Sequence, residues 1–240
     1  MRVDAGADAA RAAAARGIVA LDVPGVAEAG RFVDALGEAV GFYKIGLELF
    51  TAAGPPAVAD LAGRGKQVFL DLKLHDIPST VAGAARAASR LGATLLTVHA
   101  GGGGDMVRAA AQAVDARTRV IAVTALTSLD PARLPPHFRR DWPLEEIVLA
   151  LAEEALTAGA AGIVCAGTEV EKVKRRFGPE CACVVPGIRP RGGAKHDQAR
   201  AVTPAEALRA GADYLVIGRA VTAAADPLAA WHALWAGEDA

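Results

Sequence analysis

The chain has 240 residues, of which 52% are hydrophobic and 22% are charged, and its formal net charge is -1. This composition is typical of a folded globular protein and excludes an intrinsically disordered one. The balanced charge excludes an overall basic surface for nucleic acid, and no apolar run reaches the roughly 20 residues of a membrane-spanning helix.

The start of the chain and its cysteines indicate the compartment. Residues 1–16 are rich in alanine but carry scattered charges, so they predict a leading helix and not a signal peptide. Cys165, Cys181 and Cys183 form no even set, which favours buried thiols in a reducing compartment. A metal site at Cys181 and Cys183 is the alternative, although it lacks a second pair of ligands. We therefore expect a cytoplasmic protein.

Short β-branched runs alternate with alanine-rich segments of helical spacing along the chain. The runs predict eight strands, at Gly17–Asp22, Phe42–Gly46, Gln67–Asp71, Thr94–His99, Arg119–Thr124, Gly162–Ala166, Cys183–Pro186 and Asp213–Gly218. The segments between them predict helices at Val26–Val40, Pro55–Arg64, Val81–Leu91, Met106–Ala116, Leu144–Ala158 and Pro204–Ala210. Several of these helices end in a glycine that permits a left-handed turn before the next strand, as at Gly92, Gly159 and Gly211.

Apolar strands separated by helices are typical of a parallel sheet that is covered on both faces. Eight units in 240 residues average about 30 residues each, which is the size of one strand–helix unit. We therefore predict an α/β protein of one domain, residues 1–240, folded as a (β/α)8 or TIM barrel behind a helical extension at 1–16. An open doubly wound sheet is the alternative. The longest interval, 126–161, opens with a polar, proline-containing stretch that predicts a surface excursion or a mobile loop.

Polar residues follow most of the predicted strands at their carboxyl ends, where barrels of this class carry their active sites. A lone histidine in such a position, like His99, also fits a structural hydrogen bond. So many charged residues on one rim nevertheless predict a functional site. The residues on this rim are Asp22, Lys44, Asp71, Lys73, His99, Thr124, Thr127, Pro186, Gly187, Arg189, Gly218 and Arg219.

The segment Phe69–Thr80, FLDLKLHDIPST, interrupts a buried strand with Asp71, Lys73 and Asp76. Side chains two residues apart on a strand share a face, so Asp71 and Lys73 point the same way. Charges beside a core are costly unless they are paired, and such clusters are common in catalytic sites. A purely structural ion pair at the strand end is the alternative.

The last two loops of a barrel commonly bind a phosphate group, and here they contain PGIRP at 186–190 and IGRA at 217–220. Gly218 lets backbone N–H groups approach an anion, and a helix N-terminus beyond it adds partial positive charge. Arg189 and Arg219 are suited to bidentate, charge-assisted hydrogen bonds. The segment Arg189–Ala201 predicts a flexible lid, with a plain surface loop as the alternative.

With these residues assembled, the chain resembles the orotidine 5'-phosphate decarboxylase family, in its bacterial form, from Gly17 to Thr222. The most specific segments are FLDLKLHDIPST, VTALTS, VVPGIRP and GADYLVIGRAV. Asp-x-Lys-x-x-Asp by itself is less specific, because related phosphosugar barrels, including 3-keto-gulonate 6-phosphate decarboxylases, are similar there. The added Ile77-Pro78, Thr80, LTS and GIRP favour the orotidine 5'-phosphate decarboxylase family. Ser79 stands where the family commonly has Asn, and Ala220 where Pro is frequent, so both depart from the pattern without changing a charge.

The resemblance implies decarboxylation of orotidine 5'-phosphate to uridine 5'-phosphate in de novo pyrimidine biosynthesis, with no metal and no organic cofactor. It implies that Lys73 protonates the carbon that loses carbon dioxide, between Asp71 and Asp76. It also implies a homodimer with shared active sites. The other roles that it implies are an alternating charge array completed by Lys44, ribose contacts at Asp22 and Lys44, a pyrimidine contact at Thr127, phosphate contacts at Gln198, Gly218 and Arg219, Arg189 at the lid, and Asp76 and Thr80 reaching the neighbouring subunit's site.

Two other functions stay open on the sequence alone. The first is a metal-dependent phosphosugar decarboxylase or epimerase on the same barrel, which would need a divalent ion. The second is a non-catalytic barrel that binds a phosphorylated ligand as a sensor or scaffold. The charged residues at 71, 73 and 76 argue against it, because a pure binding protein has no use for so costly an array.

Overall fold

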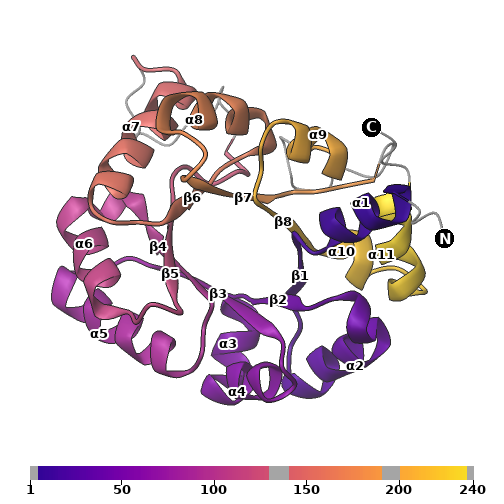
Figure 1. The fold of residues 1–240 in the computed structure, drawn as a ribbon. Helices are drawn as coiled ribbons and strands as arrows, with labels where there is room; N and C mark the ends of the chain where they lie inside the picture. The colour runs from indigo at the N-terminus through magenta and orange to yellow at the C-terminus, as the bar shows by residue number, and fades with distance from the viewer. Residues whose placement is uncertain (1–4, 130–140, 191–200, 237–240) are drawn as a thin grey trace.

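The computed structural model describes residues 5–129, 141–190 and 201–236 (Figure 1). Its sheet is a closed parallel barrel in the order β1 to β8, because β1 pairs with both β2 and β8. The predicted (β/α)8 barrel is confirmed, and closure excludes an open doubly wound sheet. The strands are β1 (Gly17–Leu21), β2 (Phe42–Ile45), β3 (Gln67–Leu74), β4 (Leu95–His99), β5 (Arg119–Val123), β6 (Gly162–Val164), β7 (Ala182–Pro186) and β8 (Tyr214–Ile217).

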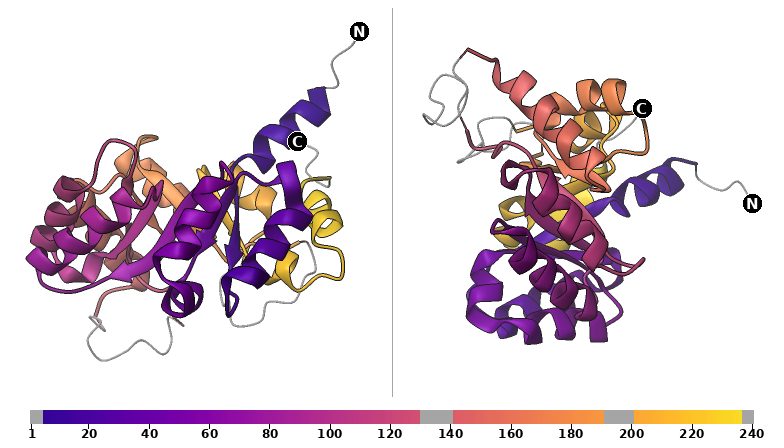
Figure 2. Two further views of the ribbon diagram at one scale, coloured as in Figure 1. Left: turned by 90° about the horizontal axis from the view of Figure 1, so that it is seen from below. Right: turned by 90° about the vertical axis from the view of Figure 1, so that its left-hand side faces the viewer.

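Helices connect the strands and form a ring around the barrel, as Figure 1 shows. In the side views of Figure 2, α1 projects away from the barrel near the C-terminal end of the described chain. The α-helices are α1 (Ala5–Ala14), α2 (Val26–Leu36), α3 (Leu47–Ala53), α4 (Pro55–Gly63), α5 (Pro78–Arg90), α6 (Gly104–Ala113), α7 (Leu144–Thr157), α8 (Val170–Phe177), α9 (Pro204–Arg209), α10 (Arg219–Thr222) and α11 (Pro227–Ala236). Short 3-10 turns are η1 (Gly37–Ala39), η2 (Ala100–Gly102) and η4 (Gly167–Glu169).

The strands are apolar on both faces because the barrel interior covers one face and the helices cover the other. Along β1, Val19 and Leu21 point outward to the helices, while Ile18 and Ala20 point into the barrel. The inward-facing residues fill the interior as a packed apolar core, as is usual for barrels of eight strands. This inner core consists of Ile18, Ala20, Phe42, Phe69, Leu95, Ile121, Val123, Val164, Ala182, Val184 and Val216.

The turns that lead into the strands follow the glycine pattern of the sequence. Gly92, Gly159 and Gly211 have φ angles of 90°, 102° and 99°, in the left-handed region that favours glycine. The predicted helix ends at these positions are therefore confirmed.

Several element boundaries differ from the prediction. Strand β3 continues three residues past Asp71 to Leu74, and α5 begins at Pro78 instead of Val81. A proline at the first helical position explains the earlier start, since its fixed φ suits that position and its missing N–H is not needed there. Helices α3, α8 and α11 are not among the helices that the sequence predicts.

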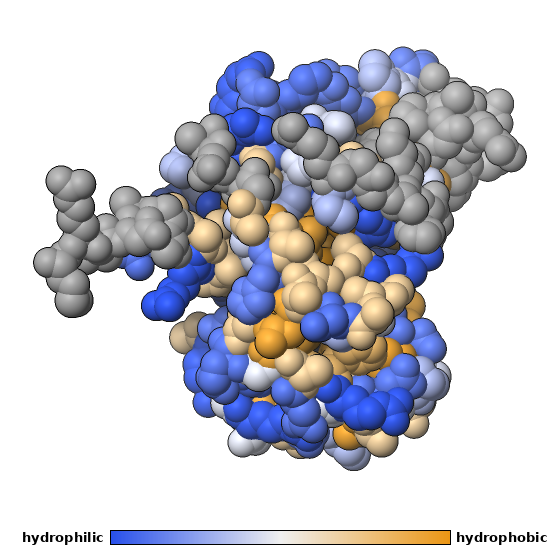
Figure 3. Space-filling view, turned by 90° about the vertical axis from the view of Figure 1, so that its right-hand side faces the viewer, coloured by the Kyte–Doolittle hydropathy of each residue, from blue (hydrophilic) through white to orange (hydrophobic). Residues whose placement is uncertain are grey.

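The surface of the barrel is mostly hydrophilic, but not uniformly so. Figure 3 views the side that carries α1, α2 and α11, where hydrophobic residues gather in the middle of the face and hydrophilic residues surround them. Within the described ranges, no helix is both long enough and apolar enough to cross a membrane.

Candidate active site

A pocket of about 570 Å³ opens at the carboxyl ends of the strands. Its floor is the top of the inner apolar core, including Phe69, Val164 and Val216. Its walls carry most of the site residues that the sequence predicts within the described chain. These are Asp22, Lys44, Asp71, Lys73, Thr127, Arg189, Gly218 and Arg219.

Four charged side chains form a continuous chain of ion pairs on one wall of the pocket. The Lys44 Nζ lies 2.8 Å from Asp22 Oδ1 and 3.7 Å from Asp71 Oδ2. The Lys73 Nζ donates to both carboxylate oxygens of Asp71, each at 2.8 Å. The order is therefore acid, base, acid, base. Asp22 directly follows β1, Lys44 lies on β2, and Asp71 and Lys73 lie on β3, so the four groups come from three neighbouring parts of the sheet.

Burial changes along this array. Lys44 and Asp71 are 7% and 9% exposed, so these two charges sit almost out of water and depend on their partners. The Lys73 side chain is 32% exposed and lines the pocket, which leaves its ammonium group accessible to a ligand. The arrangement holds a cation at the boundary between a dry core and an open cavity, where electrostatic interactions are stronger than in water.

The backbone at the end of β3 is irregular where it carries Lys73, whose side chain lines the pocket. Leu70 pairs with Leu96 and Leu74 pairs with Val98, so the register of the two strands shifts between these pairs. Lys73 has a φ of 49°, and among the described residues it is the one non-glycine residue with a positive φ. Such strain is typical of functional sites. The backbone N–H of Lys73 donates to Thr97 Oγ1 at 2.8 Å, and this hydroxyl in turn donates to Asp71 Oδ1 at 3.0 Å.

Gly46 provides the space for the Asp22–Lys44 pair. A Cβ atom at this position would lie 2.7 Å from Asp22 Oδ1 and 2.7 Å from Lys44 Nζ, closer than real Cβ contacts. The φ of Gly46 is -93°, so the glycine is needed for space and not for backbone conformation. Gly46 and Thr97 are not among the predicted site residues, because both roles depend on contacts across strands.

The wall formed by the ends of β7 and β8, which adjoins β1 in the closed barrel, carries the two predicted arginines. Arg189 is buried, its Nη1 donates to the carbonyl oxygen of Ile188 at 2.7 Å, and its N–H donates to the Val202 carbonyl at 3.0 Å. Arg219 is the first residue of α10, which has only four residues, so guanidinium groups contribute more than a helix dipole to any anion site here. Gln198 and most of the predicted lid lie outside the described residues.

Asp76 and Thr80 lie away from this pocket. Both are exposed, neither lines the pocket, and Asp76 Oδ1 accepts a hydrogen bond from the N–H of Ile77 at 2.6 Å. In the described part of the chain no ion pair joins Asp76 to Lys73. Between Asp76 and Thr80, Ile77 is 64% exposed, which is unusual for a large apolar side chain. One copy of the chain therefore does not bring the second carboxylate of the predicted cluster to Lys73.

Two other rim residues have structural contacts. Thr124 is buried and donates to the carbonyl of Val164 at 3.1 Å. His99 stacks on His75 with ring centroids 5.2 Å apart, and its Nδ1 accepts from the N–H of Gly101 at 3.4 Å. Burial lowers the pKa of His99 below its ordinary value, and the positive charges of His75 and Lys73 lower this pKa further. These surroundings therefore favour the neutral form of His99 more than water does.

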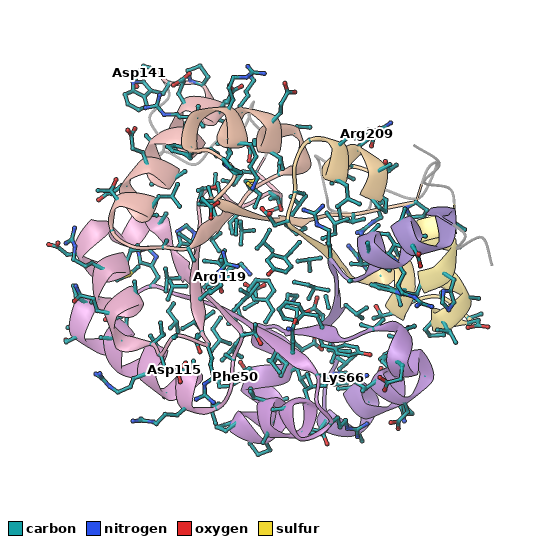
Figure 4. The ribbon with its side chains drawn as sticks, in the orientation of Figure 1. Phe50, Lys66, Asp115, Arg119, Asp141 and Arg209 are labelled. Atoms are coloured by element: carbon teal, nitrogen blue, oxygen red, sulfur yellow. The ribbon has the colours of Figure 1, made fainter. Side chains whose placement is uncertain are left out.

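The cysteines and the opposite end of the barrel lie outside this site. Cys165, Cys181 and Cys183 are free and buried, as the sequence predicts. At the amino-terminal ends of the strands, a separate polar pocket is lined by Arg16, Arg119 and Tyr214 among others. Figure 4 shows the Arg119 side chain within the ring of strands. The inner apolar core separates this pocket from the candidate active site.

Comparisons with known proteins agree with this geometry. A family model described as "Orotidine 5'-phosphate decarboxylase / HUMPS family" matches residues 16–234. The chain is 55% identical to an orotidine 5'-phosphate decarboxylase of Anaeromyxobacter dehalogenans over 218 residues, which cover 91% of this chain and 96% of that protein. It is 50% identical to one of Moorella thermoacetica over 225 residues, covering 90% and 89%.

Solved structures show the same architecture. The crystal structure of an orotidine 5'-phosphate decarboxylase from Lactobacillus acidophilus superimposes with a TM-score of 0.81 at 37% identity. The superposition covers 93% of this chain and 98% of that one. A protein of Geobacillus kaustophilus superimposes with a TM-score of 0.80 at 40% identity, covering 93% of this chain and all of that one.

Proposed function

The chain belongs to the orotidine 5'-phosphate decarboxylase / HUMPS family, and from this premise we propose the reaction and the role of each site residue. The protein is a carboxy-lyase that converts orotidine 5'-phosphate to uridine 5'-phosphate in pyrimidine biosynthesis. The alternating array of Asp22, Lys44, Asp71 and Lys73 on the pocket wall carries the proposal, because a decarboxylase of this kind needs a fixed cation beside the reacting carbon.

Lys73 is the proton donor. Loss of carbon dioxide from the pyrimidine ring leaves an electron pair on a ring carbon with little delocalisation. An ammonium group fixed beside that carbon stabilises the developing charge more than it stabilises the substrate, and only such differential stabilisation lowers the barrier. The same group then transfers its proton to the carbon. Asp71 holds the ammonium in place through two hydrogen bonds of 2.8 Å.

The remaining residues position the substrate around this centre. Asp22 and Lys44 bind the ribose hydroxyls, and Thr127 lies beside the pyrimidine. Gly218, Arg219 and Gln198 hold the phosphate, and Arg189 acts at the lid. The distance between the phosphate and the reacting carbon lets binding energy from a part of the substrate that does not react keep the array in its productive geometry. The pocket volume of about 570 Å³ is suitable for one nucleotide monophosphate.

The enzyme works as a homodimer with shared sites. Asp76 and Thr80 are exposed and lie outside the pocket of their own chain, and Ile77 between them presents an apolar side chain to the outside. These features fit a segment that reaches into a second copy, where Asp76 becomes the second carboxylate beside Lys73. The whole chain, 1–240, forms one barrel domain per subunit. The three free cysteines fit a cytoplasmic location.

A direct assay tests the reaction. Purified protein mixed with orotidine 5'-phosphate should cause a loss of substrate absorbance, and chromatography should identify uridine 5'-phosphate as the product. A wild-type protein that leaves the substrate unchanged would reject the proposed function. The turnover should survive an excess of chelator, whereas the metal-dependent phosphosugar enzyme of the alternative reading would lose its activity.

The Lys73→Ala variant tests the proton donor. It should fold, because Asp71 keeps its contacts with Lys44 and Thr97, but it should lose essentially all turnover. Circular dichroism checks the fold, and the absorbance assay checks kcat. A kcat near the wild-type value in this variant would show that another group supplies the proton.

A further inference from the structure

We propose that Thr97 is a positioning residue for this reaction, since its single hydroxyl holds the strained end of β3 and so aims Lys73 at the substrate. The inference rests on the proposed function of Lys73 as proton donor. Thr97 is absent from the pocket lining, and it acts only through Lys73 and Asp71.

The pairing of β3 and β4 shows what Thr97 has to hold. Leu96 pairs with Leu70 and Val98 pairs with Leu74, so a single residue of β4 faces three residues of β3. These three are Asp71, Leu72 and Lys73. A bulge of this kind interrupts the ladder of backbone hydrogen bonds and re-aims the side chains of the longer strand. The N–H of Lys73 must therefore find another acceptor.

The Thr97 hydroxyl is that acceptor. It accepts the N–H of Lys73 at 2.8 Å and donates its own hydrogen to Asp71 Oδ1 at 3.0 Å, so it acts as both an acceptor and a donor. Thr97 is 0% exposed, and a hydroxyl in such a place is costly unless it is bonded in this way. Its β-branched side chain also has few rotamers, which fixes the direction of the hydroxyl.

These two bonds connect the backbone of Lys73 to the carboxylate that holds the Lys73 ammonium. The φ of 49° at Lys73 is unfavourable for a lysine, so surrounding contacts must maintain it. Without the hydroxyl, the Lys73 N–H and one Asp71 oxygen lose their buried partner together. The end of β3 is then free to relax, and the Lys73 ammonium moves away from the reacting carbon.

The test compares three variants of the full-length protein. Thr97→Val keeps the shape of the side chain but removes the hydroxyl, Thr97→Ala removes it without adding a methyl group, and Thr97→Ser keeps it. We expect kcat to fall about 100-fold in the Val and Ala variants, because misplacing a catalytic group by about 1 Å has effects of this size. KM and the affinity for uridine 5'-phosphate should change less than about threefold, since the lost interaction acts on the chemical step. Thr97→Ser should keep kcat within about fivefold of wild type.

A purely structural role predicts a different pattern, and it would overturn the proposal. In that case the Ser, Ala and Val variants would lose thermal stability and product affinity together, or the Val and Ala variants would fail to fold. A wild-type kcat in either of these two variants would also overturn it. Crystal structures of the wild type and the Thr97→Val variant separate this inference from the proposed function, because they need no turnover. We expect the variant's Lys73 to leave the left-handed region and its Nζ to move from Asp71, and an unchanged geometry would reject the positioning role.

Discussion

At the scale of single residues, the array is held together by contacts on both sides of each buried charge. The ammonium group of Lys44 is nearly buried and lies between the carboxylates of Asp22 and Asp71. Removing either carboxylate therefore takes away one of its two ion-pair partners. Breaking a buried pair in this way commonly costs about 3–5 kcal/mol, and loss of activity then cannot be separated from loss of fold. Substitutions that keep both charged groups but shift their positions are more informative.

Gly46→Ala is such a substitution. Its Cβ would lie 2.7 Å from both Asp22 Oδ1 and Lys44 Nζ, so the two ends of the ion pair must move apart. Because both atoms end mobile side chains and the φ of -93° suits alanine, the free energy of unfolding should change little. We expect kcat/KM for orotidine 5'-phosphate to fall at least about tenfold, measured with the absorbance assay.

Gly41→Ala provides the matched control for this change. Gly41 directly precedes β2 and Gly46 directly follows it, and a Cβ at position 41 would meet nothing within 4 Å. This variant should keep wild-type kinetics. If Gly46→Ala kept them as well, the spacing of the Asp22–Lys44 pair would be unimportant for the reaction.

His99 should give the stability of the protein a specific pH dependence. Its pKa in the folded state is lowered by burial first and by His75 and Lys73 second, from an ordinary value of 6.5. Between the folded and unfolded values, the unfolded chain therefore binds more protons. The contribution of His99 to the free energy of unfolding should be complete above about pH 6.5. This contribution should decrease as the pH drops below that value.

Urea denaturation across this pH range measures the effect. His99→Gln carries no titrating ring, so its stability should decline less steeply between neutral and mildly acidic pH. An equal slope in the wild type and the variant would assign the pH dependence to other groups.

The sequence shows some of these residues more clearly than others. Asp71 and Lys73 are conspicuous because they interrupt an apolar run in the sequence, and charges inside such a strand are costly unless they have a function or a partner. Thr97 and Gly46 are not, because a threonine in a strand and a glycine after one are ordinary. Their roles arise from the register between β3 and β4 and from the distance between β2 and Asp22, which only the folded chain defines.

At the scale of elements, the strands are predictable because burial on both faces gives them continuous apolar runs. The helices are less predictable, and each of the three that the sequence does not predict has its own physical reason. Helix α3 is short, α8 buries only Val170 and Val173 among charged residues, and α11 is apolar on nearly every side. A short helix offers too few residues for a periodic pattern, and a helix without a polar face offers no contrast between its sides.

Strand β7 leaves no room for a side chain at Gly162 of β6. Gly162 pairs with Ala182, and a Cβ at position 162 would lie 2.6 Å from the Ala182 Cβ and 2.7 Å from its carbonyl carbon. The neighbouring backbone cannot move aside easily, so Gly162→Ala should lower the free energy of unfolding by about 1–3 kcal/mol. Thermal denaturation should show a lower Tm.

The matched substitution for this element is Gly63→Ala, at the end of α4. A Cβ there meets nothing within 4 Å, and alanine favours a helix more than glycine does. Its Tm should equal or exceed that of the wild type. A wild-type Tm for Gly162→Ala would mean that the strands can separate without cost.

At the scale of the whole molecule, the proposed homodimer with shared active sites makes a prediction about mixed dimers. A Lys73→Ala chain and an Asp76→Asn chain should each be inactive alone. In a mixed dimer, the site of the Asp76→Asn chain has its own Lys73 and its partner's Asp76, so it is intact. Random mixing of the two variants should restore about a quarter of the wild-type activity, because half the dimers are mixed and each has one complete site.

Mixed dimers are isolated with two different affinity tags, and their turnover is measured. If mixed dimers form but remain inactive, Asp76 does not serve the neighbouring subunit.

The apolar filling of the barrel also determines how substrate enters and how products leave. Side chains such as Ile18, Phe42 and Leu95 close the cylinder below the charged groups, so the reaction chamber is a cup and not a tunnel. Reactant, nucleotide product and carbon dioxide must all pass the same mouth. A bound product molecule blocks the entry of the next substrate. The rate of product release therefore sets an upper limit on kcat, however fast the chemical step is.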